Sequence, residues 1–219
     1  MSLKLPKLLV IRHGETQWNV AGRLQGHLDT PLTLNGVRQA MAVAAHLSET
    51  VEALGEVSHW VSPLGRARQT ASILAGIWGR PFEAFVIAPM LAERRYGSWE
   101  GRTLDEIRQT MPDQFEARGL APWTYAMPDG ESPADLTQRL LTWLQGLNPD
   151  HAHVVVSHSG CLRALRGLYS QAAPEEVLAY REPQTTAFLL APGEEIMLGV
   201  SASGLRAFGC EGEGRTVLI

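Results

Sequence analysis

Short apolar runs that end in polar residues, each followed by a stretch of helical periodicity, constrain this chain more than any other feature. Residues 7–13 (KLLVIRH), 57–62 (VSHWVS) and 153–157 (HVVVS) are such runs, and residues 82–87 are a further candidate strand. The apolar runs near the start and at 153–157 are typical of strands buried on both faces of a sheet, and residues 57–62 alternate as a strand does. Their alternation with helical segments predicts an α/β fold, a three-layer α/β/α sandwich with a mostly parallel central sheet.

Several segments between these runs carry signals of helix initiation, which are a capping Ser or Thr, a proline in the first turn, or both. The marking residues are Thr33, then Pro63, then Thr103 with Glu106 as a capping box for a helix to about Thr110, then Ser132 with Pro133 and Asp135. A further helix is expected from Gly160. The expected inner faces are Val37, Met41, Ala44 and Leu47 in the first helix, Ala67, Thr70 or Ala71, Leu74 and Ile77 or Trp78 in the second, and Leu136, Leu140, Leu144 and Leu147 in the fourth.

The remaining segments set the expected domain organisation. Residues 185–190 and 197–208 are predicted to form two or three strands. Residues 112–130 contain three prolines and two glycines, so we expect a short cap or an irregular loop at about 102–130. Neither a repeat nor a low-complexity linker divides the sequence, and we therefore expect a single domain over residues 1–219.

Composition excludes several classes of protein. With 45% hydrophobic and 19% charged residues, the chain can form a core and is not disordered. The formal net charge of −4 has the wrong sign for a nucleic-acid-binding protein. The early apolar run, residues 8–11, is far shorter than the ~20 residues that span a bilayer, and no export signal precedes it. We therefore expect a cytoplasmic protein with no nucleic-acid or membrane partner, and a homodimer is compatible with the sequence.

Three predicted strands end in side chains suited to binding an anion. The first end carries Arg12 and His13, the second leads to Arg66, and the third carries His158 and Ser159 at the start of a helix. Because the carboxyl ends of parallel strands meet at one edge of a sheet, we expect these side chains to lie together. Guanidinium groups and a helix N-terminus are complementary to a phosphate monoester, and a neutral imidazole can attack its phosphorus.

Each of these residues alone also has an ordinary structural interpretation. An Arg12–His13 pair is compatible with a solvated loop, Arg66 with a surface position, and His158 with a buried histidine bonded to backbone. Neither histidine has a second ligand at a metal-binding spacing, so no metal and no other cofactor is expected. The coincidence of three polar strand ends favours the phosphate site.

Blocks of the sequence resemble the histidine phosphatase superfamily, which includes the cofactor-dependent phosphoglycerate mutases. The blocks are LVIRHGETQWN (9–19), GRLQG (22–26), PLT with Gly36 (31–36), SPLGRARQTA (62–71), LAERRYGSWEG (91–101), DGES (129–132) and VSHSG (156–160). They follow the family's order over most of the chain. The resemblance implies a phosphoglycerate mutase-like fold and metal-independent phosphoryl transfer through a phosphohistidine.

The resemblance also implies roles for individual residues. His13 would be the phosphorylated nucleophile and Glu93 the proton donor to the leaving group, later the base for water. The implied catalytic residues are His13, Glu93, His158, Arg12 and Arg66, and the implied phosphate- or substrate-binding residues are Arg12, Asn19, Gln25, Gly26, Arg66, His158 and Ser159. Residue types alone do not separate Glu93 from the other glutamates, Glu83, Glu100 and Glu131. We interpret Glu15 and Glu131 as structural hydrogen-bonding residues.

A phosphatase transfers the phosphoryl group to water and a mutase transfers it to a bound hydroxy acid. The ERRYG block (93–97) resembles the mutase form, but the segment 101–130 is much shorter than the mutase insertion, and SGC (159–161) stands where mutases favour Gly-Asn-Ser. Residues 112–130 offer a single cation, Arg118, beside three carboxylates and the side chains Phe115, Trp123, Tyr125 and Met127.

These apolar side chains suit a small phosphate monoester with an apolar or aromatic body, or else they anchor the segment on the core. We therefore expect a phosphomonoesterase that acts on a small phosphorylated metabolite. A phosphoglycerate mutase and a non-catalytic phosphate-binding module are the alternatives.

Overall fold

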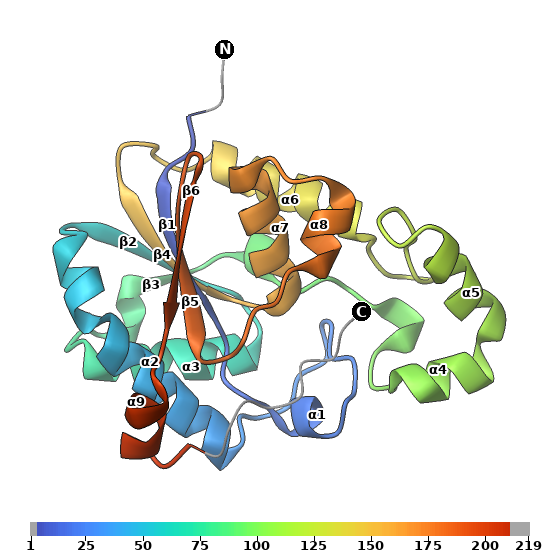
Figure 1. Cartoon of the computed structure of the whole chain (residues 1–219), viewed down its shortest axis with the longest axis horizontal. Helices are drawn as coiled ribbons and strands as arrows, with labels where there is room; N and C mark the ends of the chain where they lie inside the picture. Colours follow the sequence, from blue (N-terminus) through green and yellow to red (C-terminus); the bar gives the residue numbers. More distant parts are fainter. Residues whose placement is uncertain (1–3, 211–219) are drawn as a thin grey trace.

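A sheet of six strands with helices on both faces forms the centre of the computed structural model, which describes residues 4–210 (Figure 1). The strands are β1 (Lys7–Arg12), β2 (Val57–Val61), β3 (Phe85–Ile87), β4 (Ala152–Ser157), β5 (Thr186–Ala191) and β6 (Glu194–Gly199). Their order is β3-β2-β4-β1-β5-β6, in which β1 to β4 pair in parallel and β5 runs antiparallel to both of its neighbours. The expected α/β class with a mostly parallel sheet is confirmed.

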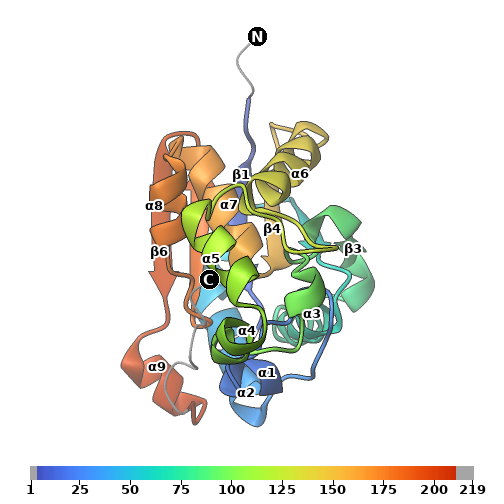
Figure 2. The same ribbon diagram turned by 90° about the vertical axis from the view of Figure 1, so that its right-hand side faces the viewer.

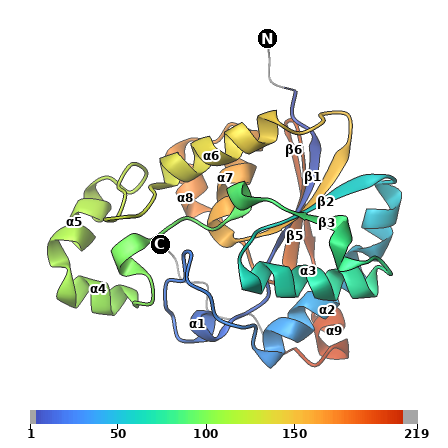
Figure 3. The ribbon, with the colours of Figure 1, turned by 180° about the vertical axis from the view of Figure 1, so that it is seen from behind.

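The strand β1 is apolar throughout because it is covered on both faces. Leu8 and Val10 pack with helices α6 (Pro133–Gln145) and α7 (Ser159–Ser170), whereas Leu9 and Ile11 pack with α2 (Leu34–Ala53) and α3 (Gly65–Ile77). All four side chains are at most 1% exposed. Figure 3 shows the two helix layers from behind. Burial of the apolar area on both faces is the main force that holds the three layers together.

Capping residues start most of the predicted helices where expected. Thr33 caps α2 and accepts a hydrogen bond from the Gly36 amide at 2.9 Å. Capping boxes at Thr103 and Ser132 start α4 (Leu104–Thr110) and α6. α3 begins at Gly65, two residues after Pro63, and α7 begins at Ser159.

One predicted inner face needs correction. Met41 of α2 is 36% exposed, whereas the predicted Ala44 and Leu47 are buried together with Ala40 and Val43. The helix is oriented by Gly36, which packs on the backbone of Glu15 so closely that a Cβ would lie 2.0 Å from its carbonyl oxygen. At the end of α3, Trp78 packs against the core while Ile77 is 38% exposed, so the second of the two alternatives holds. Leu147 packs against the core as expected, from a position just beyond the end of α6.

Three segment predictions were wrong in part. Residues 82–84 form a 3-10 turn, which leaves only Phe85–Ile87 in β3. Residues 112–120 form α5 (Pro112–Leu120), because a proline in the first turn of a helix lacks only an N–H that would have no partner. In the segment 197–208, β6 begins earlier, at Glu194, and Ser201 caps a helix, α9 (Ala202–Ala207). The structure also contains α1 (Gln17–Val20), α8 (Pro174–Ala179) and 3-10 turns at Pro89–Leu91 and Gly97–Trp99, which were not predicted.

Helices α4 and α5 lie to one side of the sheet and stand in front of it when viewed from that side (Figure 2). They carry an apolar cluster of their own, separate from the two clusters on the sheet. Its members are Leu24, Tyr96, Trp99, Ile107 and Met127, with Leu104, Met111, Phe115 and Tyr125 packed against them. Three of the four apolar side chains singled out in the segment 112–130 therefore anchor it, and Trp123 does not belong to this cluster. Within residues 4–210, none of the helices is long and apolar enough to cross a membrane.

Candidate active site

The carboxyl ends of β1, β2 and β4 meet at one edge of the sheet. Arg12 is the register partner of Ser157, and the His13 amide donates to the Ser157 carbonyl at 3.0 Å. A cavity of about 400 Å³ opens there, which we call the strand-end cavity. Its walls are Arg12, His13, Asn19, Arg23, Leu24, Gln25, Gly26, Arg66, Glu93, Tyr96 and Ser159. Eight of the nine predicted site residues line it, and the ninth, His158, does not.

The imidazole of His13 is held in one orientation. Its Nδ1 lies 2.7 Å from the Gly14 carbonyl oxygen, which can only accept, so Nδ1 carries the proton and Nε2 of the neutral ring keeps its lone pair. The side chain is 3% exposed. Burial, together with the positive charges of Arg66 and Arg12, lowers the pKa of His13 well below its ordinary value. A neutral imidazole beside two cations is suited to attack an anionic phosphorus centre.

His158 lies beside His13 and is fully buried. The two ring centroids are 5.1 Å apart, and Nε2 of His158 is 2.7 Å from the Ser62 hydroxyl oxygen. Burial first, and then the charge of Arg66, lowers the pKa of His158 well below its ordinary value. Both histidines are therefore neutral at physiological pH, and they belong to one site.

Two arginines are fixed by backbone carbonyls at this edge. Arg12 donates from Nη1 to the Glu182 carbonyl at 2.7 Å, and burial lowers its pKa to about 10, so it remains protonated at neutral pH. Arg66, 1% exposed, donates to the Gly26 carbonyl at 2.8 Å and pairs with Asp29 at 2.9 Å. Gly26 has a φ of +53°, and a Cβ there would lie 2.1 Å from a Glu100 carboxylate oxygen, so this turn requires glycine.

The amide of Asn19 is oriented by two N–H donors. The backbone N–H of Thr16 and the side-chain Nε2 of Gln184 both donate to Asn19 Oδ1 at 3.0 Å. This atom is the oxygen, so the N–H₂ end of Asn19 is left for the cavity. Gln25, 7% exposed, accepts through Oε1 from the Thr30 hydroxyl at 3.3 Å.

The carboxylate of Glu93 is held at the N-terminus of α7. Its two oxygens accept from the backbone N–H groups of Arg94 at 2.8 Å and Gly160 at 3.2 Å. A Cβ on Gly160 would lie 2.4 Å from the carboxylate, so the close approach depends on glycine. The carboxylate is 5% exposed and faces the same cavity as His13.

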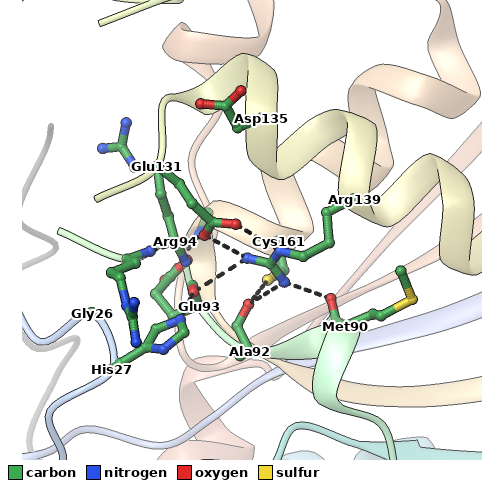
Figure 4. A network of polar contacts seen from close by, with 12 residues as sticks. Gly26, His27, Met90, Ala92, Glu93, Arg94, Glu131, Asp135, Arg139 and Cys161 are labelled. Atoms are coloured by element: carbon green, nitrogen blue, oxygen red, sulfur yellow. Dashed lines mark hydrogen bonds and ion pairs between the residues drawn. The ribbon is translucent and has the colours of Figure 1, made fainter. Parts of the chain in front are cut away.

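Arg139 of α6 fixes the loop that carries Glu93 (Figure 4). Its guanidinium donates to the carbonyls of Met90 at 2.6 Å and Ala92 at 3.0 Å, and it pairs with Glu131 at 2.8 Å. The Glu93 carbonyl accepts from the same guanidinium at 3.4 Å and lies 2.9 Å from Nε2 of His27. The loop is thus held on both sides of the carboxylate that reaches the cavity, and Glu131 has the structural role expected of it.

Several residues of the site were missed by sequence reasoning. Arg23, Leu24 and Tyr96 line the cavity, while Asp29, Arg139, Glu182 and Gln184 hold lining residues or their loops. Glu182 is 170 positions from Arg12, and Gln184 is 165 positions from Asn19. Such separations leave no local signal in the sequence.

Comparison with known proteins agrees with this geometry. The profile of the histidine phosphatase superfamily (branch 1) matches residues 8–194. Phosphoglycerate mutase-like protein 4 of Arabidopsis thaliana is 35% identical over 77% of this chain and 71% of that protein, and metal-independent phosphoserine phosphatase of the same plant is 32% identical over 78% and 71%.

Two further proteins bear on length and fold. The chain spans 24% of the Arabidopsis thaliana 6-phosphofructo-2-kinase/fructose-2,6-bisphosphatase, to which it is 32% identical over 89% of its own length. The crystal structure of the α-ribazole phosphatase from Shigella flexneri superposes with a TM-score of 0.73 at 28% identity, covering 89% of this chain and 96% of that one. The mutase-like, three-layer architecture is therefore shared with solved structures.

Proposed function

The chain belongs to branch 1 of the histidine phosphatase superfamily, and from that premise we propose that it hydrolyses a small phosphate monoester through a phosphohistidine formed on His13. The observation that carries the proposal is the neutral, oriented imidazole of His13, which shares the wall of one cavity with Arg12, Arg66 and Glu93. The phosphatases among the relatives, which include a phosphoserine phosphatase, support hydrolysis.

In the first step, Nε2 of His13 attacks phosphorus and the bond from phosphorus to the ester oxygen breaks. Arg12, Arg66 and the amide of Asn19 bind the three other phosphate oxygens, on which charge is concentrated in the transition state. The leaving oxygen takes a proton from the carboxyl group of Glu93 and departs as an alcohol.

In the second step, water replaces the alcohol. The Glu93 carboxylate takes a proton from the water, whose oxygen attacks phosphorus while the bond to Nε2 breaks. Inorganic phosphate leaves, and His13 and the protonated Glu93 are restored. Because guanidinium groups and backbone N–H groups supply the positive charge, the proposed steps need no metal ion.

The test is phosphate release from a panel of monoesters, with and without a chelator, combined with rapid acid-free quenching to trap the phosphoenzyme. We expect turnover that is insensitive to the chelator and a labelled enzyme that is stable in base and labile in acid, as phosphoimidazoles are. Release of phosphate without any phosphoenzyme, or none with any ester, would contradict the proposal.

The same panel separates the alternatives. A mutase would interconvert phosphoglycerates when a bisphosphoglycerate is added, and a binding module would retain phosphate esters without turnover. The short segment 102–130 contributes few cations to balance a bisphosphate, which is why hydrolysis is the preferred outcome.

A further inference from the structure

A second cavity adjoins the first and shares Tyr96 and Ser159 with it. We call it the helix-face cavity, because α6, α7 and α8 provide most of its walls around about 450 Å³. Its lining is Arg94, Tyr96, Trp123, Pro133, Leu136, Thr137, Ser159, Gly160, Arg163, Ala164, Val177 and Leu178. Its position next to Ser159 and Gly160, on the Glu93 side of the strand-end cavity, is where a leaving group would extend from a bound phosphate.

The walls of the helix-face cavity are largely apolar. Leu136 of α6 and Val177 and Leu178 of α8 line it, and Trp123 lines it from the segment between α5 and α6. Phe115, Tyr125 and Met127 of the segment 112–130 belong to the neighbouring apolar cluster, whereas Trp123 does not. An aromatic or branched apolar group would be buried between this indole and the helix residues.

The same cavity contains a cation without an anionic partner. Arg94 is 6% exposed and its guanidinium lies 4.5 Å from the centre of the Tyr96 ring. Within residues 4–210, its side chain makes neither a hydrogen bond nor an ion pair, whereas Arg163, which also lines the cavity, pairs with Glu182 at 2.8 Å. Among the described residues that line the cavity, none is a carboxylate.

Further positive charge lies nearby. Burial and the positive charge of Arg94 lower the pKa of Arg118 on α5, which places the two cations within electrostatic reach of each other. A buried guanidinium that stacks on a ring but lacks a counter-ion is stabilised by an incoming anion, and its fork of N–H donors matches a carboxylate.

We propose that the helix-face cavity binds the leaving group, and that this group is an aromatic or branched apolar body carrying a carboxylate that Arg94 binds. The inference rests on the proposed function, since a leaving group exists only if His13 accepts the phosphoryl group. It names the substrate class as phosphate monoesters of apolar hydroxy acids and excludes neutral alcohols as the preferred substrates.

The test compares 4-carboxyphenyl phosphate with phenyl phosphate, which have the same reacting bond and differ in one carboxylate. For the natural sequence we expect kcat/KM to favour the carboxylated ester by about tenfold or more, mainly through KM. Arg94→Met should abolish this preference while changing kcat/KM for phenyl phosphate by less than about threefold, and Arg94→Lys should retain part of it. Trp123→Ala should raise KM for both esters.

Arg108→Met is the matched control, because Arg108 also lies over an aromatic ring, that of Phe115 at 5.0 Å, but is 63% exposed and pairs with Asp105. It should leave the preference unchanged. Equal kcat/KM for the two esters in the natural sequence, or a preference that survives in Arg94→Met, would overturn the inference. Absence of turnover with both esters and of a phosphoenzyme would instead overturn the proposed function, so the two failures are distinguishable.

Discussion

The strand-end cavity and the helix-face cavity meet at Tyr96 and Ser159, yet they are built in different ways. The first takes Arg12 and His13 from the end of β1, where the backbone is fixed by the sheet and both side chains are almost fully buried. The second is formed by helix surfaces and by the segment between α5 and α6. The difference indicates that the sheet determines the chemistry, while the covering segments determine which ester is accepted.

The largest expected effect is the loss of the nucleophile, which should be the same whichever leaving group the helix-face cavity accepts. His13→Ala should lower kcat by at least about 10³-fold for every monoester, because no other neutral, oriented imidazole lines the strand-end cavity in the described part of the chain. The fall in kcat is measured from initial rates with several esters, and the loss of the phosphoenzyme is measured by trapping. His46→Ala, on the exposed surface of α2, is the control. A loss of kcat that varied strongly between esters would contradict the assignment of chemistry to the strand-end cavity and of ester selection to the helix-face cavity.

Glu93 lines the strand-end cavity and accepts from the Gly160 amide, which lines the helix-face cavity, so the effect of its removal should depend on the leaving group. Glu93→Gln should lower kcat about 10²-fold or more for an alkyl ester such as glycerol phosphate, whose oxygen needs a proton. The loss should be below about tenfold for p-nitrophenyl phosphate, which leaves without one. Glu83→Gln, an exposed glutamate that residue type alone did not distinguish, should change neither rate. Equal losses with the two esters would show that another group is the acid.

Arg139 should have a smaller effect of the same kind, because it acts only through the loop that carries Glu93. Arg139→Met is expected to lower kcat for glycerol phosphate by about tenfold and to leave p-nitrophenyl phosphate within about threefold. Arg139→Lys should recover part of the loss. The exposed Arg68 gives a control in Arg68→Met. A uniform loss with both esters would indicate general loosening of the fold rather than misplacement of the carboxylate.

Sequence reasoning succeeded where a signal is local. The run 7–13 shows its strand directly, and the capping box of Thr103 with Glu106 marks the start of α4 to the residue. The polar strand ends lie together because parallel strands leave no other arrangement for them. For these features, a few consecutive residues contain the whole physical reason for the structure.

The remainder depends on contacts between distant segments. Glu93 could not be chosen from residue types because the Gly160 amide, 67 positions away, fixes its place. The helix-face cavity combines residues from position 94 to position 178, so neither Arg94 nor Trp123 could be assigned to it in advance. The segment 202–207 was misassigned as strand because Ser201 was not recognised as a cap for α9.

The smallest expected effect is on stability, and of the two cavities it arises at the strand-end site alone. This site contains the buried His13 and His158, whereas the described residues that line the helix-face cavity include no histidine. The folded-state pKa values of His13 and His158 are lowered, so below pH ~6.5 the unfolded chain binds protons that the native chain does not. The free energy of unfolding must then fall as the pH falls, by up to about 1.4 kcal/mol per pH unit for each such histidine. Urea unfolding between pH 7.5 and 5 measures the slope, to which His59, with a pKa of about 4 through burial, also contributes. His13→Asn should reduce the slope of the free energy of unfolding against pH. A free energy of unfolding that rose toward pH 5 would mean that these imidazoles are charged in the folded protein, and a charged imidazole could not serve as a nucleophile.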